Sequence, residues 1–160
     1  MIEMTFDSNE PLLGIGIAAK KLGVSPELLR LYEREGLVVT HKTKSGHRLY
    51  SEKDLEWING FREQMTENRM NIAGVRMLLA LMPCWDIKSN SSKTVCKTCK
   101  AYKNSHVVCW TLTVRESNGC KDGSCRECEV YILACQADKL NHMHVVIDDK
   151  IPGYSKNLNE

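Results

Sequence analysis

The 160-residue sequence predicts a mainly helical protein in two parts, a helical first half and a small irregular module rich in cysteine. Two observations support this division. Before Pro83, apolar residues recur at helical spacing in several short segments that begin with capping residues. All eight cysteines lie between Cys84 and Cys135, and none lies in the first 83 residues. We therefore expect a domain boundary near Pro83.

Composition divides the chain into four expected segments: an N-terminal extension (residues 1–12), a helical domain (residues 13–82), a cysteine-rich module (residues 83–148) and a polar tail (residues 149–160). The formal net charge is +2, so any electrostatic argument must be local. No apolar run approaches the roughly eighteen residues that a membrane span needs, and the acidic N-terminus does not resemble a signal peptide. We expect a cytoplasmic chain without membrane contact, where cysteines rarely form structural disulfides.

Two short helices joined by a glycine turn are predicted at the start of the helical domain. The first has apolar residues at helical spacing, namely Ile15, Ala18, Ala19 and Leu22. Gly23 can end it in a left-handed conformation, and Ser25 is a natural N-cap for the second helix, with Pro26 at the first helical position. The apolar face of the second helix is expected to consist of Leu28, Leu29, Tyr32 and Leu37. This pattern is typical of a helix-turn-helix, although many helical hairpins share it.

A basic turn follows the second helix in the segment THKTKSGHRLY. Four basic side chains surround the turn at Ser45 and Gly46, namely Lys42, Lys44, His47 and Arg48. Basic residues flanking a tight turn suit a two-stranded wing that contacts phosphates, whereas a basic loop elsewhere is usually only a solvated surface. Ser51 then begins another helix with Asp54 three residues on, and Asn71 begins a last helix. These elements together predict a winged helix-turn-helix.

This combination resembles the DNA-binding domain of the mercury-resistance-regulator (MerR) family. The family pattern is met here as "IGIAAKKLGVSPELLRLYEREGL" and "GHRLYSEKDL", with three motifs in order at the right spacing over about residues 13–82. The resemblance implies a transcriptional regulator that binds double-stranded promoter DNA as a homodimer, in concert with RNA polymerase. The recognition helix would enter the major groove, the wings would grip the flanking backbone, and distortion of the promoter would be part of the mechanism.

The resemblance also implies which residues contact DNA. Arg30 would reach DNA from the recognition helix, although a surface ion pair with Glu27 or Glu33 is the alternative. The full set implied by the resemblance is Ser25, Arg30, Lys42, Lys44, His47, Arg48 and Tyr50. Tyr32 is expected to pack in the core. No heptad run follows Pro83, so dimerisation is expected through the last helix and the cysteine module.

The cysteine-rich half contains two related units. The first runs from Cys84 to Tyr102 and the second from Cys109 to Tyr131. Each begins with Cys-Trp and ends with Cys-x-x-Cys, two further residues and a tyrosine, which indicates a tandem duplication. The arrangement resembles the two-CW cysteine-rich domains attached to some bacterial regulators. The tryptophans would either shield a metal centre from water or form the core of the module.

All eight cysteines are candidate metal ligands, because a Cys-x-x-Cys pair places two thiolates on one turn. We expect an iron–sulfur cluster, of the 4Fe–4S type in the favoured case. One four-thiolate set is Cys84, Cys96, Cys99 and Cys109, and a second is Cys120, Cys125, Cys128 and either Cys109 or Cys135. Structural zinc is the alternative, since the two pairs form C-x2-C-x25-C-x2-C. A thiol switch, or direct binding of a thiophilic metal, is the third possibility.

Two classes of function follow from these features. The favoured one is a DNA-binding transcriptional regulator whose cysteine module senses redox state, oxygen, a reactive gas or a metal, with a purely structural zinc module as its variant. The other is an enzyme or electron carrier that uses the helix-turn-helix as an interaction module. Paired carboxylates, a nucleophile elbow, a phosphate loop and a dinucleotide fingerprint are all missing from the sequence, so we do not expect an enzyme.

Overall fold

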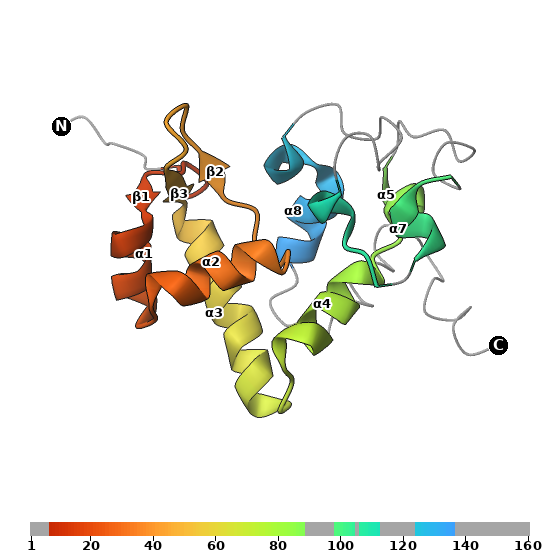
Figure 1. The fold of residues 1–160 in the computed structure, drawn as a ribbon, viewed down its shortest axis with the longest axis horizontal. Helices are drawn as coiled ribbons and strands as arrows, with labels where there is room; N and C mark the ends of the chain where they lie inside the picture. Colours follow the sequence, from red (N-terminus) through yellow and green to blue (C-terminus); the bar gives the residue numbers. More distant parts are fainter. Residues whose placement is uncertain (1–6, 89–97, 105, 113–123, 137–160) are drawn as a thin grey trace.

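The computed structural model describes residues 7–88, 98–104, 106–112 and 124–136. Within them the fold is mainly helical, as predicted, with one small antiparallel sheet (Figure 1). The first half contains β1 (Leu13–Gly14), α1 (Ile15–Leu22), α2 (Pro26–Arg34), β2 (His41–Lys42), β3 (Arg48–Tyr50), α3 (Glu52–Glu67) and α4 (Ile72–Ala80). The second half contains α5 (Cys84–Ile87), α7 (Lys100–Lys103), the 3-10 helices η1 (Cys109–Thr111) and η2 (Cys125–Glu127), and α8 (Glu129–Gln136).

Helices α1 and α2 form the predicted helix-turn-helix. Gly23 ends α1 with a φ of 63°, a left-handed conformation that glycine adopts without steric cost. The Ser25 hydroxyl accepts the amide of Leu28 at 3.2 Å and so caps α2, whose first residue is Pro26. The buried residues of the two helices belong to one core and are Ala18, Ala19, Leu22, Leu29 and Tyr32. The local capping signals therefore located both helices correctly.

The predicted wing is present as a three-stranded antiparallel sheet with strand order β1-β3-β2. Lys42 pairs with Arg48 across the wing, and Leu13 of β1 pairs with Tyr50 on the other side of β3. The turn is closed by the Thr43 amide, which donates to the His47 carbonyl at 3.0 Å. The edge strand β1 precedes α1 directly, so the sheet ties the wing to the helix-turn-helix.

Helix α3 is the central element of the first half. Ser51 and Asp54 form a reciprocal capping box at its start, with the Asp54 amide 3.1 Å from the Ser51 hydroxyl. Its Phe61 ring meets Tyr32 edge-on at 5.0 Å, which anchors α3 against α2. Among the described residues, no single helix is long and apolar enough to cross a membrane, and α3 with residues 72–87 meets that test only as a pair bent by 116°.

The two halves share the larger of two hydrophobic clusters among the described residues. Second-half residues in this core include Val108, Trp110, Val130 and Ala134, which join the buried residues of α2, α3 and α4. Figure 1 shows α8 between the helices of the first half and the short helices α5 and α7. The cysteine module is therefore docked on the helix-turn-helix domain and can influence it by direct contact.

Candidate nucleic-acid interface and cysteine centre

Arg30 lies on the exposed side of the recognition helix α2. Its side chain is 46% exposed and its Nη1 atom lies 3.0 Å from Oε1 of Glu27, one turn earlier in the helix. The alternative raised from the sequence, an ion pair with Glu27, is therefore present. An exposed pair of this kind contributes little to stability, so Arg30 can exchange Glu27 for another anion at small cost.

Glu33 joins the recognition helix to the wing, a role that the sequence analysis missed. Its carboxylate pairs with Lys42 at 3.0 Å and with Arg48, and it accepts the Thr40 hydroxyl at 3.1 Å. Burial tends to raise the pKa of Glu33, but the hydrogen bonds from Arg48 and Lys42 outweigh it and hold that pKa below its usual value. The Glu33 carboxylate thus fixes the base of the wing against α2.

The tip of the wing carries basic side chains that are free to meet an anion. Lys44 and His47 are both exposed, and among the described wing residues only Lys42 and Arg48 take part in ion pairs. Ser25 is also exposed, although its hydroxyl already accepts the capping hydrogen bond of α2. Six of the seven predicted DNA-contact residues therefore have exposed or half-buried side chains.

Tyr50 is the seventh, and its position does not fit the predicted role. Its side chain is 0% exposed and packs in the core, so it cannot reach a phosphate. The hydroxyl has no hydrogen-bond partner among the described residues, and burial raises the pKa of Tyr50 to about 12. Arg48 and Tyr50 lie on the same face of β3, and Arg48 is half-buried there through its ion pair with Glu33 of α2.

The two cysteine units show the same local arrangement. In the first, Trp85 of α5 meets Tyr102 of α7 edge-on, with ring centres 4.8 Å apart and an interplanar angle of 78°. In the second, Trp110 of η1 meets Tyr131 of α8 at 5.2 Å and again 78°. Each tryptophan thus packs on the tyrosine that follows the Cys-x-x-Cys pair of its own unit. This matching contact agrees with the predicted tandem duplication.

Four cysteines of the two units are linked through their effects on one another's pKa. Cys84 and Cys109 act on each other, and Cys125 and Cys128 act electrostatically on Cys109. Both links are among those expected from the sequence, since Cys84 and Cys109 share its first set and Cys109 is an alternative member of the second set with Cys125 and Cys128. Cys99 lies in a separate small cluster with Ala101 and Leu112, against which Cys109 packs. Cys96 and Cys120 lie outside the described residues.

The four neighbouring thiols provide an all-sulfur donor set. Hydrogen bonding by Cys109 lowers the pKa of Cys84, whereas the bond to Cys84, burial and the charges of Cys128 and Cys125 raise the pKa of Cys109. The chemistry of such a set fits zinc or an iron–sulfur cluster. The described residues nevertheless contain no group of three His, Cys, Asp or Glu side chains that converges closely enough to hold a metal ion as it stands.

Three side chains of the second unit hold the segment that connects α2 to the wing. Trp110 Nε1 donates to the Gly36 carbonyl at 2.7 Å. The Val39 amide donates to the Tyr131 hydroxyl at 2.9 Å, and Arg126 Nη1 donates to the Val39 carbonyl at 2.6 Å. Sequence reasoning missed these contacts, which join positions 74 to 92 residues apart.

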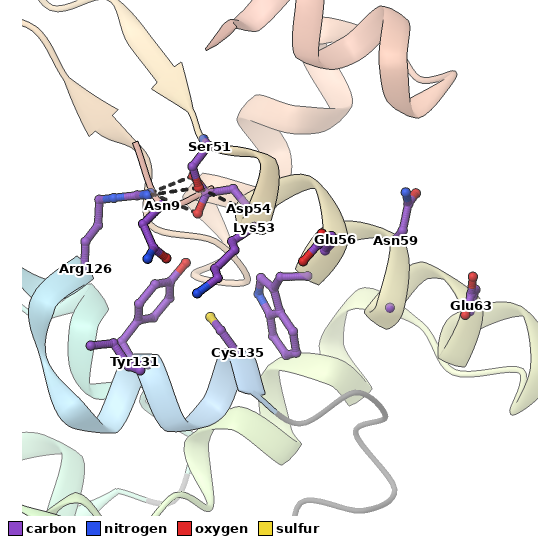
Figure 2. A pocket seen from close by; sticks show the side chains of 13 residues that line it. Asn9, Ser51, Lys53, Asp54, Glu56, Asn59, Glu63, Arg126, Tyr131 and Cys135 are labelled. Atoms are coloured by element: carbon purple, nitrogen blue, oxygen red, sulfur yellow. Dashed lines mark hydrogen bonds and ion pairs between the residues drawn. The ribbon is translucent and has the colours of Figure 1, made fainter. Parts of the chain in front are cut away.

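Arg126 also reaches the start of α3. Its Nη1 atom lies 2.8 Å from Asp54 Oδ2 and its Nη2 atom 3.4 Å from the Ser51 hydroxyl, as Figure 2 shows. The same region borders a cavity of about 600 Å3 between α3 and α8, which Cys135 and Tyr131 help to line. Burial raises the pKa of Cys135 to about 12.

Comparison with known proteins identifies the first half. Residues 14–81 match the model of the MerR HTH family regulatory proteins. Over 79 residues the chain is 33% identical to the "Putative heat shock protein HspR" of Streptomyces coelicolor, covering 49% of this chain and 51% of that protein. Over 53 residues it is 43% identical to an uncharacterized HTH-type transcriptional regulator of Synechocystis sp., covering 32% of this chain and 38% of the relative.

The extent of these matches limits them to one part of the chain. The chain spans about half the length of the first relative and less of the second. No solved structure matches the chain. The matched residues coincide with the helix-turn-helix, the wing, α3 and α4. Residues 14–81 therefore resemble the helix-turn-helix domain of MerR-family regulators.

Proposed function

We propose that this chain is a transcriptional regulator that binds double-stranded promoter DNA through α2 and the wing. The observation that carries the proposal is the bridge at Glu33. Because this α2 carboxylate holds Lys42 and Arg48, the helix and the wing present their basic side chains as one unit. Arg30 and Lys44 are exposed on that unit. The MerR-family domain and the HTH-type regulator among the relatives support the same function.

In this proposal α2 enters the major groove and the wing contacts flanking phosphates. Arg30 exchanges Glu27 for the DNA, and Lys44 and His47 reach the backbone from the wing tip. These contacts position the protein, and each contact to a phosphate releases counterions. Regulation then acts through the conformation of the promoter on which RNA polymerase assembles, and we propose no enzymatic activity.

We further propose that the chain acts as a homodimer, with α4 at or near the contact. Leu81, at the end of α4, is 52% exposed and Met77, one turn earlier, is 36% exposed. Two large apolar side chains on one exposed stretch favour association with a second copy. A Leu81→Asp variant should reduce the molecular mass measured by light scattering to that of one chain. A monomeric wild type would exclude the homodimer.

DNA binding is tested by selection from a random pool of double-stranded DNA with the full chain. The expected result is enrichment of one duplex sequence that the wild type binds and that an Arg30→Ala, Lys44→Gln double variant binds much more weakly. A Lys53→Gln variant is a matched control, because Lys53 is exposed beside the cavity between α3 and α8. Failure of the wild type to enrich any sequence would exclude the proposed function.

For the cysteine module we propose an iron–sulfur centre, held by Cys84, Cys109, Cys125 and Cys128, that senses redox state, oxygen, a reactive gas or a metal. Support comes from the effect of Cys84, Cys125 and Cys128 on the pKa of Cys109, and from the preference of such clusters for cysteine thiolates. When bound, such a centre supplies a change of charge or ligation that these residues convert into a shape change. Structural zinc on the same thiols is the second candidate, favoured by the small size of the module.

Elemental analysis separates the two candidates. Protein purified without oxygen should be brown and contain iron and acid-labile sulfide in a fixed ratio. Cys125→Ser should abolish that content, whereas Cys99→Ser, in the separate cluster, should retain it. Colourless protein with stoichiometric zinc would contradict the cluster and leave the DNA-binding proposal intact.

A further inference from the structure

We propose that the Cys125–Cys128 pair controls the placement of the wing through Arg126, which acts as a positioning residue and does not itself contact DNA. Arg126 lies between the two cysteines in η2. The inference rests on the proposed function for its consequence at DNA. The coupling itself concerns only contacts within the chain and can be measured without DNA.

Arg126 contacts the chain on both sides of the wing, before β2 and after β3. Val39, whose carbonyl accepts a hydrogen bond from Arg126 Nη1 at 2.6 Å, lies two residues before the start of β2. Ser51, whose hydroxyl lies 3.4 Å from Arg126 Nη2, directly follows β3. The guanidinium therefore joins the residue that enters the wing to the residue that leaves it. The wing contributes only a two-residue and a three-residue strand, so this bridge is a large share of what fixes its orientation.

This bridge is also buried. The Arg126 side chain is 15% exposed and its partner Asp54 is 7% exposed. A desolvated ion pair is favourable only when its geometry is good, and a displaced partner leaves a buried charge without compensation. We therefore expect Arg126 either to make all of its contacts with Val39, Ser51 and Asp54 or to lose them together. Asp54 also accepts the Ser51 amide at 2.8 Å, so withdrawal of Arg126 disturbs the cap of α3 as well.

The other two contacts with the segment before the wing, from Trp110 and Tyr131, are made by residues close to the same two cysteines. The Cys125 thiol lies 4.0 Å from the Trp110 carbonyl, and Trp110 holds Gly36. Tyr131, which holds Val39, lies one turn after Cys128 in α8. A change in the spacing of the two thiols rotates η2 and moves all three contacts together. Residues 36–39 are therefore the segment through which a change at the two cysteines alters the position of the wing.

The test is hydrogen exchange at the amides of residues 39–50 in the full chain, purified without oxygen. A Cys125→Ser, Cys128→Ser double variant should raise exchange there by roughly tenfold or more relative to wild type. Arg126→Gln should raise it to a similar level with both cysteines intact, and combining the changes should add nothing. Arg126→Lys keeps the charge but loses the planar, two-pronged guanidinium, so its wing exchange should fall between wild type and Arg126→Gln.

Arg76→Gln is the matched control. The Arg76 guanidinium also joins two helices, because its Nη1 atom lies 2.9 Å from Glu35 Oε2 at the C-cap of α2, but Arg76 lies outside the cysteine module. Wing exchange in this variant should still respond to loss of the two cysteines. Thermal unfolding by circular dichroism must remain cooperative, and Arg126→Lys keeps the test valid if Arg126→Gln does not fold.

Two outcomes would overturn the inference: unchanged wing exchange in the cysteine double variant, or additive effects of the cysteine and Arg126 changes. The duplex obtained by selection then separates the two proposals. If wing exchange responds to the two cysteines but the wild type binds no duplex, the proposed function is excluded and the coupling stands. If the wild type binds the duplex but loss of the two cysteines leaves wing exchange unchanged, the coupling is excluded and the proposed function stands.

Discussion

Gly36 tests most sharply whether the cysteine module is docked as described. It follows Glu35, the C-cap of α2, has a φ of +76°, and its carbonyl accepts the hydrogen bond from Trp110 Nε1. A Cβ atom at this position would lie 2.3 Å from Thr111 Cγ2, far closer than carbon atoms approach one another. Gly36→Ala therefore adds one methyl group, which strains the local backbone and also clashes with Thr111 of η1.

The expected cost has two parts. Alanine in a left-handed conformation costs about 1–2 kcal/mol relative to glycine. Relief of the clash moves Thr111 and weakens the hydrogen bond from Trp110 to Gly36, for about 1–2 kcal/mol more. Thr111→Ser removes the clashing Cγ2 atom and can keep the hydroxyl bond to Val108 at 2.7 Å. The double variant should therefore recover the second part and leave only the backbone cost.

Urea unfolding of the full chain measures both parts. With a slope of about 2 kcal/mol per molar, Gly36→Ala should lower the midpoint by roughly 1–2 M, and Thr111→Ser should restore about half of that loss. Thr111→Ser alone is the control and should change little. If Gly36→Ala leaves the midpoint unchanged, or if Thr111→Ser restores nothing, the described contact between η1 and residue 36 is refuted.

Three further predictions concern single side chains. Tyr50→Phe should raise the free energy of unfolding by about 1 kcal/mol, because it removes a buried hydroxyl that has no partner among the described residues. DNA affinity should not change, and a loss of affinity would indicate that Tyr50 contacts DNA. Glu33→Gln should destabilise the protein at neutral pH. Because the folded-state pKa of Glu33 is lowered, its contribution exists above 4.5, and the difference from wild type should shrink as the pH falls from 5 to 3; a constant difference would argue against the bridge. Trp110→Phe should cost about 1–3 kcal/mol by leaving the Gly36 carbonyl unpaired, measured by urea unfolding, and more than Trp85→Phe, so equal losses would contradict the docking bond.

Local signals explain why the first half could be predicted from the sequence. Gly23, Ser25 and the pair Ser51 and Asp54 act within three or four residues of themselves, so their capping roles can be recognised from sequence alone. The burial of Tyr50 could not be derived in the same way. A basic strand next to an aromatic residue does not reveal which face meets the core until the register with β1 is known.

The contacts of Arg126 illustrate what the sequence leaves open. The Cys-x-x-Cys pattern predicts a role for the two cysteines, but no local pattern around Arg126 predicts its contact with Asp54, 72 positions away. The sequence also leaves open whether Cys109 or Cys135 joins the second set of cysteines, because spacing does not fix contacts between segments that are distant along the chain. Non-local contacts of this kind depend on how α8 docks against the first half.

The most direct measurement of the central claim, that α2 and the wing bind duplex DNA, is the salt dependence of affinity for the selected duplex. The logarithm of the association constant falls with the logarithm of salt concentration by about 0.9 for each phosphate contact. Lys44→Gln should reduce this slope by about one contact, whereas Lys53→Gln, away from the proposed interface, should leave it unchanged. Identical slopes for wild type and Lys44→Gln, or a reduced slope for Lys53→Gln, would contradict the account.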